Sequence, residues 1–333
     1  MNAGPELLSA PLPPPPAPFL YELRPLSLGE ILDRTFSIYR KRFWLYVGLS
    51  SIAAAVPTLS TFVQFGFAMP TAGAKPEQAV RQVGILFAIL IGTGLVALIA
   101  FSLTQSATVA AVTATYLGET TSIGSALRIA RKHWLRYILI TLWQGWSATW
   151  VFLVAYILFI GLIIIPGMRA MIPVFTVLFV LMLLASFVYG VIAYLRNSLG
   201  VVASTVEDLK VRAAMRRSKV LVAGHKGRVF VIFLLAGVLQ MVASVVQGFS
   251  GYFVGISHGF VRTGFEALSL AITFVTSAMV VPVSAIALCL FYVDERVRKE
   301  GFDVEMLMNR AIGPPVETLN PDLLPSPFTS ELT

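Results

Sequence analysis

The sequence predicts an all-α polytopic membrane protein with six transmembrane helices and three interfacial amphipathic helices. Hydrophobic residues make up 57% of the chain and charged residues 13%, and the mean hydropathy is +0.81. A soluble domain carries about 25% charged residues, so this composition excludes an ordinary soluble fold. Six apolar segments reach the roughly 20 residues that a helix needs to cross a bilayer.

Polar connections that hold most of the charge separate the six predicted spans. The spans cover residues 45–69, 83–104, 137–165, 172–195, 229–248 and 267–293. The second can continue as one helix to Tyr116, because residues 106–115 contain no helix breaker. Pro166 and Gly167 predict a tight turn between the third and fourth spans. No charged residue or histidine falls near the middle of a span, which disfavours ion-coupled transport.

The segment at 23–44 carries the clearest helix start. Ser27 and Glu30 have the spacing of a capping box, and Leu26 and Ile31 have the spacing of a hydrophobic staple. In the helix that follows, apolar residues gather on one side and charged residues on the other. This pattern is typical of a helix that lies at a membrane surface.

Two later connections resemble this opening segment. Thr121 or Ser122 is placed to cap a second amphipathic helix, and Thr205 is predicted to open a third, which ends at Gly224. Each helix leads directly into a span, so the unit of basic helix, span out and span back occurs three times.

An aromatic residue lies near the start of the first span in each of the three units, and these residues are evenly spaced. Phe43, Trp134 and Phe230 lie 91 and 96 residues apart. This near-constant period predicts three parallel repeats around an axis normal to the membrane, although generic hairpins would produce part of the same pattern.

The distribution of Lys and Arg predicts the orientation in the membrane. Of the 25 such residues, 21 fall on one side of the predicted spans and 4 on the other. By the positive-inside rule, the protein is a multi-pass cell-membrane protein with both termini in the cytoplasm. The net charge of +8 is then explained at the membrane surface, and we expect no nucleic-acid partner.

The chain divides into three regions by composition. Residues 1–22 are predicted to form a disordered Pro-rich arm, residues 23–305 the membrane domain, and residues 306–333 a disordered tail. The single cysteine, Cys289, lies in the last apolar segment and is expected to be a small core residue.

The richest candidate site is a cluster of cytoplasmic cations around the third amphipathic helix. Basic residues beside an anionic leaflet contribute about 1 kcal/mol each, so the cluster could hold anionic lipid head groups. The alternative is that these residues only set topology and anchor the helix. The candidate lipid-binding residues are Arg212, Arg216, Arg217, Lys219, Lys226 and Arg228.

A mixed-charge segment at 294–303 follows the last span. Glu295 and Lys299 are spaced as an i,i+4 pair, which indicates a solvated helix. A docking site for a protein partner at this cytoplasmic tail is the alternative.

Five glutamines lie in or beside the spans. They could line a neutral polar cavity, as in a permease or lipid transporter, or bond neighbouring helices together. The residues concerned are Gln64, Gln105, Gln144, Gln240 and Gln247.

Three segments resemble a known family: LRPLSLGEILDRTFSIYRKRF, VEDLKVRAAMRRSKVLVAG and FYVDERVRKEGFD. They are similar to bacterial integral membrane proteins with the glycerophosphoryl diester phosphodiesterase membrane domain, over about residues 23–305. That family sometimes carries a catalytic barrel, which takes about 250 residues. Only 28 residues follow Glu305, and the three histidines, His133, His225 and His258, are far apart in sequence.

We therefore expect no enzyme activity, no catalytic residues, no metal site and no cofactor. The predicted function is a non-enzymatic membrane protein that binds anionic lipid or a partner through its basic cytoplasmic face. A permease or lipid transporter is the alternative.

Overall fold

The computed structural model describes residues 24–66, 76–116, 119–164 and 171–302, together with Val304 and Met308. Within these residues the chain forms helices and no strands. The helices are α1 (Leu28–Lys41), α2 (Phe43–Gly66), α3 (Pro76–Tyr116), α4 (Ile123–Lys132), α5 (Trp134–Ile164), α6 (Ile172–Asn197), α7 (Gly200–Val206), α8 (Val211–Val222), α9 (Lys226–Ile256) and α10 (Gly259–Glu300).

The structure confirms an all-α polytopic membrane protein. Six of the described helices, α2, α3, α5, α6, α9 and α10, are long and apolar enough to cross a bilayer. The predicted extension of the second span is also confirmed, because α3 runs unbroken to Tyr116. Pro57 and Pro282 both lie inside continuous helices.

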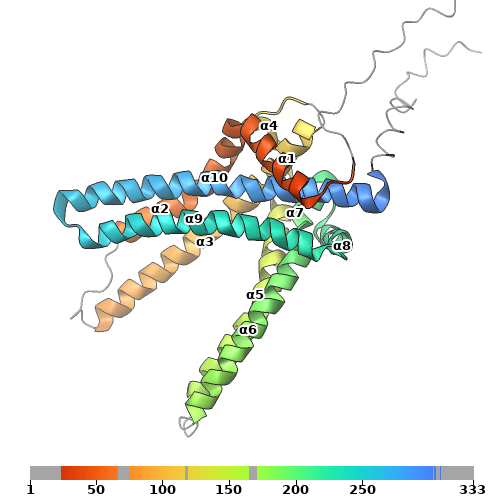
Figure 1. The fold of residues 1–333 in the computed structure, drawn as a ribbon. Helices are drawn as coiled ribbons and strands as arrows, with labels where there is room; N and C mark the ends of the chain where they lie inside the picture. The colour runs from red at the N-terminus through yellow and green to blue at the C-terminus, as the bar shows by residue number, and fades with distance from the viewer. Residues whose placement is uncertain are drawn as a thin grey trace, which may run out of the picture.

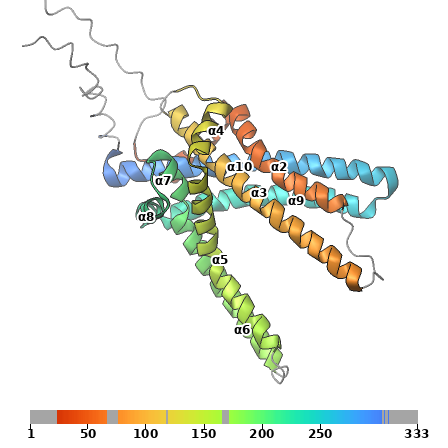
Figure 2. The same ribbon diagram turned by 180° about the vertical axis from the view of Figure 1, so that it is seen from behind.

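The order of elements repeats three times. A short amphipathic helix precedes each hairpin of spans, as α1 before α2–α3, α4 before α5–α6 and α8 before α9–α10. The three hairpins do not form a parallel bundle: α5–α6 diverges from α9–α10 in Figures 1 and 2. The repeat is therefore clear in the order of the elements, whereas the hairpins spread apart from a common end.

That common end, here called the cap, holds the buried core. It consists of α1, α4, α7, α8 and the C-terminal parts of α3 and α10, which pack together (Figure 1). At 1.5 Å per residue, α3 and α10 are each about 60 Å long, twice the roughly 30 Å of bilayer hydrocarbon. Their buried residues concentrate near the C-terminal ends, as Ala107–Val112 of α3 and Ala285–Tyr292 of α10 illustrate.

The amphipathic helices bury their apolar sides in the cap. Ile31 and Ile38 of α1, Ala126 of α4, and Met215 and Leu221 of α8 have at most 3% of their surface exposed. The structure thus differs from the expected apolar contact with the membrane surface, because these faces meet the protein's own core. The sides that remain for water or lipid head groups carry most of the charged residues of these helices, together with a few apolar ones such as Ile129 and Val220.

The predicted start of the first amphipathic helix is confirmed. The Ser27 hydroxyl accepts a hydrogen bond from the Glu30 amide at 3.3 Å, and the Glu30 carboxylate accepts one from the Ser27 amide at 2.6 Å. Ser122 caps α4 in the same way, with Ser125 as its partner.

The predicted start of the third amphipathic helix is wrong. Thr205 lies inside a separate buried helix, α7, and its hydroxyl donates to the Val201 carbonyl instead of capping. Asp208 then adopts a φ of 51°, which turns the chain before α8 begins. Gly200 lets α7 approach α8 closely, because a Cβ there would lie 2.8 Å from the Met215 sulfur.

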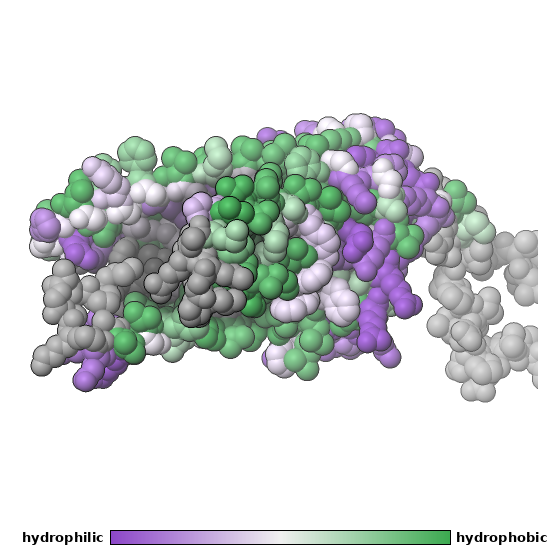
Figure 3. All heavy atoms as spheres, turned by 90° about the horizontal axis from the view of Figure 1, so that it is seen from below, coloured by the Kyte–Doolittle hydropathy of each residue, from purple (hydrophilic) through white to green (hydrophobic). Residues whose placement is uncertain are grey.

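The surface separates into polar and apolar zones. Figure 3 shows hydrophilic residues gathered at the cap end and hydrophobic residues over much of the remaining face. Exposed large apolar side chains are spread along α3, α5, α6 and α9, where a bilayer would cover them. Some predictions concern parts outside the described residues or side chains. They are the arm, the tail apart from Met308, the Pro166–Gly167 turn and Gln64.

Candidate functional site

The C-terminal end of α10 is buried inside the cap. Asp294 and Glu295 have 1% and 0% of their surface exposed. The predicted solvated helix is therefore wrong at this point, although the expected Glu295–Lys299 pair is present at 3.4 Å. Because an isolated buried carboxylate is costly, both residues need cationic or hydrogen-bonding partners.

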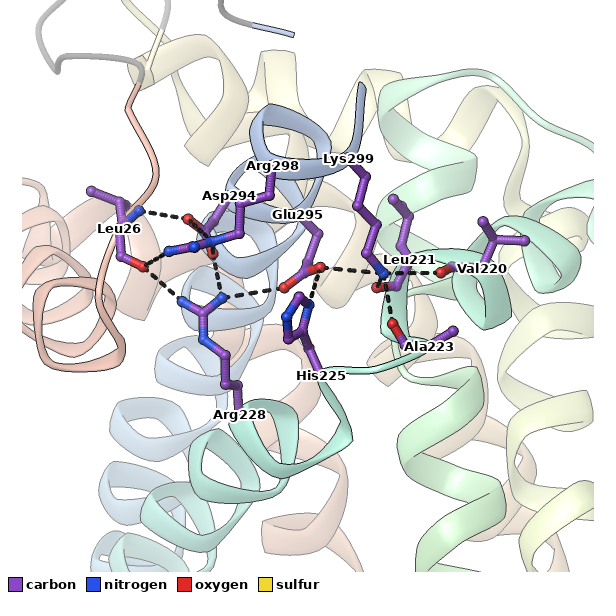
Figure 4. A network of polar contacts seen from close by, with 10 residues as sticks. All are labelled: Leu26, Val220, Leu221, Ala223, His225, Arg228, Asp294, Glu295, Arg298 and Lys299. Carbon is purple, nitrogen blue, oxygen red and sulfur yellow. Dashed lines mark hydrogen bonds and ion pairs between the residues drawn. The ribbon is translucent and has the colours of Figure 1, made fainter. Parts of the chain in front are cut away.

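Asp294 joins the end of α10 to the start of α1. Its carboxylate accepts a hydrogen bond from the Leu26 amide at 2.6 Å and pairs with Arg228 at 2.7 Å and Arg298 at 3.0 Å (Figure 4). Arg228 and Arg298 also donate to the Leu26 carbonyl, at 2.7 and 2.5 Å. The backbone just before α1 is thus fixed by three charged side chains.

Glu295 joins α10 to the connection between α8 and α9. It pairs with Arg228 at 3.2 Å and with His225 Nδ1 at 2.7 Å. Lys299, one turn later, donates to the carbonyls of Val220, Leu221 and Ala223 at 2.6–3.1 Å (Figure 4). These carbonyls end α8 and have no partner within that helix, so Lys299 supplies the missing donors.

Arg217 forms a second network on the other side of α10. Its guanidinium binds Glu207 with contacts of 2.8–3.0 Å and also pairs with Glu300. Tyr292 donates to the same Glu207 carboxylate. The hydrogen bonds that Arg217 donates to the Glu300 carboxylate raise the pKa of Arg217 above its usual range, so this side chain stays charged and bound.

Other cations of α8 are on the surface of the cap. Arg212 and Arg216 are exposed and Lys219 is half-buried, and Lys226 is exposed at the start of α9. The structure gives these four side chains no acidic partner among the described residues. A shallow groove of about 660 Å³ lies beside α8, lined in part by Lys210, Arg212, Arg216 and Arg217.

One acidic residue beside this surface has its own partner. Asp208 pairs with Arg136 at 2.6 Å, and this hydrogen bond holds the pKa of Asp208 below its usual range. Glu207 is likewise bound by Arg217. The nearby carboxylates therefore leave the positive charge of Arg212 and Arg216 uncompensated.

The structure divides the six predicted lipid-binding residues into two groups. Arg217 and Arg228 belong to the ion-pair networks with the carboxylates of α10 and Glu207. Arg212, Arg216, Lys219 and Lys226 have no such partner among the described residues. Sequence reasoning missed the anchoring role of Asp294 and Glu295. A signal was available in the spacing, since Asp294 and Glu295 lie one helical turn after the apolar Leu290 and Phe291 and so continue the same faces of the helix.

The histidines do not converge. His133 lies 3.6 Å from Asp208, whereas His225 contacts Glu295. His258 precedes α10, at the far end of that helix from the cap. No group of three His, Cys, Asp or Glu side chains in the described part of the chain has the arrangement of a metal site.

Two of the predicted glutamines bond within separate hairpins. Gln144 of α5 donates to the Asn197 carbonyl at the end of α6 at 2.7 Å. Gln247 of α9 donates to the Thr276 hydroxyl of α10, also at 2.7 Å. These contacts favour helix packing over a shared polar cavity.

Comparison with known proteins assigns a family to this chain. The model of a domain of unknown function (DUF8558) matches residues 72–311, more than two thirds of the chain. No curated protein and no solved structure matches. The protein therefore belongs to the DUF8558 family.

Proposed function

We propose that this protein is a non-enzymatic, multi-pass protein of the cell membrane that binds anionic lipid head groups through its cap. The binding surface consists of Arg212, Arg216 and Lys219 on α8, together with Lys226. The observation that carries the proposal is the contrast within α8: Arg217 is bound by two carboxylates, whereas Arg212 and Arg216 are exposed and have no acidic partner in the described structure.

The physical argument is that uncompensated charge of one sign on a membrane protein attracts the opposite charge of the leaflet. Each cation near an anionic surface contributes about 1 kcal/mol. The buried apolar side of α8 holds these cations in a fixed arrangement, since Met215 and Leu221 are almost fully buried. Cations on a helix that is held in place bind a phosphate with less loss of conformational entropy than the same cations on a flexible segment would.

The proposal includes an orientation, with the cap and both termini in the cytoplasm. The positive-inside rule supports it, because most of the basic residues lie on α1, α4, α8 and the end of α10. Arg81 and Arg262, in contrast, lie near the opposite ends of α3 and α10.

The proposal also keeps the relationship to the glycerophosphoryl diester phosphodiesterase membrane domain, without its catalytic activity. Supporting it are the basic and mixed-charge segments that carry the resemblance, which form the cap and its ion pairs. Asp294, Glu295 and Glu300 are engaged by cations, so they are poor candidates for the carboxylate ligands of a catalytic metal.

Native mass spectrometry on the full chain tests the proposal. The protein is extracted from vesicles of equal phosphatidylglycerol and phosphatidylcholine, and the retained lipids are counted. We expect the R212Q/R216Q/K219Q variant to lower the affinity for phosphatidylglycerol about 100-fold, since three cations are removed. The matched control is R128Q/R131Q/K132Q, which removes the same charge from α4.

Retention of phosphatidylglycerol by the control and its loss from the α8 variant would support the proposed site. Equal retention by all three proteins would overturn it. Equal loss from both variants would also overturn it, because the cations of α8 would then act only through the total charge of the cap.

A further inference from the structure

A second candidate site lies within the membrane-spanning region, between the α5–α6 hairpin and α9. A cleft of about 1060 Å³ is lined there by α5, α6 and α9, almost entirely with apolar side chains. Phe187, Ile192, Phe230, Leu234 and Met241 are among the lining residues. Each is 45–69% exposed in the structure, so this apolar surface has no protein cover among the described residues.

The cleft narrows toward the cap. Tyr194 of α6 and Phe233 of α9 meet edge to face, with 5.2 Å between their ring centroids, and both line the cleft. The two hairpins then diverge away from this contact (Figure 1). The shape is therefore a wedge with its closed end at the cap.

The depth of the wedge fits one leaflet of a bilayer. The lining of α9 runs from Phe230 to Met241, which is about 16 Å of helix at 1.5 Å per residue. Half of a bilayer's hydrocarbon is about 15 Å. An acyl chain that starts at the cap end would therefore contact the wall over most of its length.

A cation lies where each wall of the cleft reaches the cap. Arg196 follows Ile192 by one turn of α6, and Lys226 precedes Phe230 by one turn of α9, so each continues a stripe that lines the cleft. Both side chains are exposed, and the structure gives neither an acidic partner within the described part of the chain.

We propose that this cleft binds one anionic phospholipid from the leaflet on the cap side. The acyl chain lies along α6 and α9, and the phosphate lies at the level of Arg196 and Lys226. This site shares only Lys226 with the surface proposed above, and its acyl-chain cleft goes beyond that function. The variants that test the two sites change different residues and leave Lys226 in place, so either proposal can fail without the other.

Charge favours a lipid over a second copy of the chain. In a symmetric dimer formed through this cleft, the Arg196 and Lys226 side chains of both copies would lie at the same depth in the membrane, and four like charges would gather at one interface. Apolar contact gives little net gain inside a bilayer, because lipid tails are as apolar as the cleft wall. The head-group cations must therefore provide the selectivity, and they select an anion.

Photo-crosslinking tests the site in the full chain. The protein is placed in phosphatidylcholine vesicles that contain a small fraction of phosphatidylglycerol with a photoreactive acyl chain, and adducts are located by mass spectrometry. We expect adducts in residues 183–195 and 230–241. A phosphatidylcholine probe with the same acyl chain measures the contribution of the head group.

Two variants separate the acyl and head-group contacts. Gly237 lines the cleft, and a Cβ there meets nothing within 4 Å, so Gly237→Leu fills the cleft without a backbone clash. We expect a several-fold loss of adducts. Gly248→Leu is the matched control, because Gly248 lies further along the same helix and is equally open.

Arg196→Gln is expected to lower labelling by the phosphatidylglycerol probe, relative to the phosphatidylcholine probe, roughly fivefold. This factor is the gain in affinity that one cation provides beside an anionic head group. Arg128→Gln on α4 is the charge control. The Arg196 variant leaves the cleft packing unchanged, so it tests the proposal even if Gly237→Leu fails to fold.

The proposal is overturned if labelling avoids both cleft segments, or if the Gly237 and Gly248 variants label equally. Crosslinks between two copies of the chain at α6 and α9 would also overturn it, since they would make the cleft a dimer interface.

Discussion

Arg216 and Arg217 are neighbours in the chain, yet their environments differ completely. Arg217 is enclosed by Glu207 and Glu300 and has 22% of its side chain exposed. Arg216 is exposed beside the groove on α8 and has no acidic partner in the described structure. Arg217 thus stabilises the cap, and Arg216 is available to a ligand, although the two residues are chemically identical and adjacent in the sequence.

The difference shows that a basic cluster in a membrane protein is not a single unit. A helix turns 100° per residue, so consecutive cations point in different directions. Those that face α10 meet its carboxylates, and those that face away meet solvent or lipid. Neutralising the cations that face α10 should therefore reduce stability, whereas neutralising those that face away should reduce binding.

The largest expected effect is on the buried side of this comparison, at Arg228. Replacing it with Met leaves Asp294 and Glu295 buried without their shared cation, which should lower the free energy of unfolding by about 3–5 kcal/mol. Thermal and denaturant unfolding in detergent measure this change. Arg228→Lys should recover only part of the loss, because an ammonium cannot reproduce the guanidinium contacts. A loss below about 1 kcal/mol would contradict the proposed role of the network.

An intermediate effect is expected when Arg217 and Arg216 are compared directly. Arg217→Gln removes charged hydrogen bonds to two carboxylates in a partly exposed setting and should cost about 1–3 kcal/mol. Arg216→Gln should stay within about 0.5 kcal/mol of the native protein, as surface substitutions do. Unfolding curves of the two variants under identical conditions provide the measurement. Equal losses would mean that the two arginines are not distinguished in the way the structure indicates.

The smallest expected effect concerns Glu30, an acidic residue at the exposed start of α1. Hydrogen bonds from the Ser27 amide and hydroxyl, and from Arg24, lower the pKa of Glu30 to about 2. Because the pKa of Glu30 is lower in the folded protein, its ionised carboxylate stabilises the helix fully at pH values above the pKa of the unfolded chain, near 4.5. That contribution is lost as the pH falls toward 2.

The difference in thermal midpoint between the native protein and Glu30→Gln should therefore be small at pH 7 and should shrink between pH 4.5 and 2. Added salt should reduce the part of this difference that comes from the Arg24–Glu30 ion pair, because the pair is exposed to solvent. A difference that grew on acidification would show that the capping box does not depend on the charge of Glu30.

Much of the fold was predictable from local patterns. The six spans follow from length and hydropathy, and the predicted and observed ranges largely agree. The capping box at Ser27 depends only on residues within one turn. The break that separates α7 from α8 was missed because Asp208 adopts a positive φ, which a non-glycine side chain rarely does.

The candidate site was predictable only in part. The sequence identified the six cations near α8, but it did not distinguish those bound by carboxylates from those that have no acidic partner in the described structure. Arg228 and Asp294 are 66 residues apart, and Leu26 is 268 residues from Asp294. No local pattern reports a contact of that range.

The sequence by itself determined the class of this protein, because the need to satisfy backbone groups in a bilayer leaves long apolar segments few alternatives to spanning helices. It also determined which end carries the positive charge. Only the tertiary structure decided where the carboxylates of α10 lie, and hence which cations they neutralise. The cleft between α6 and α9 is likewise a property of the tertiary structure alone, because the divergence of the two hairpins depends on packing in the cap and not on the composition of either hairpin.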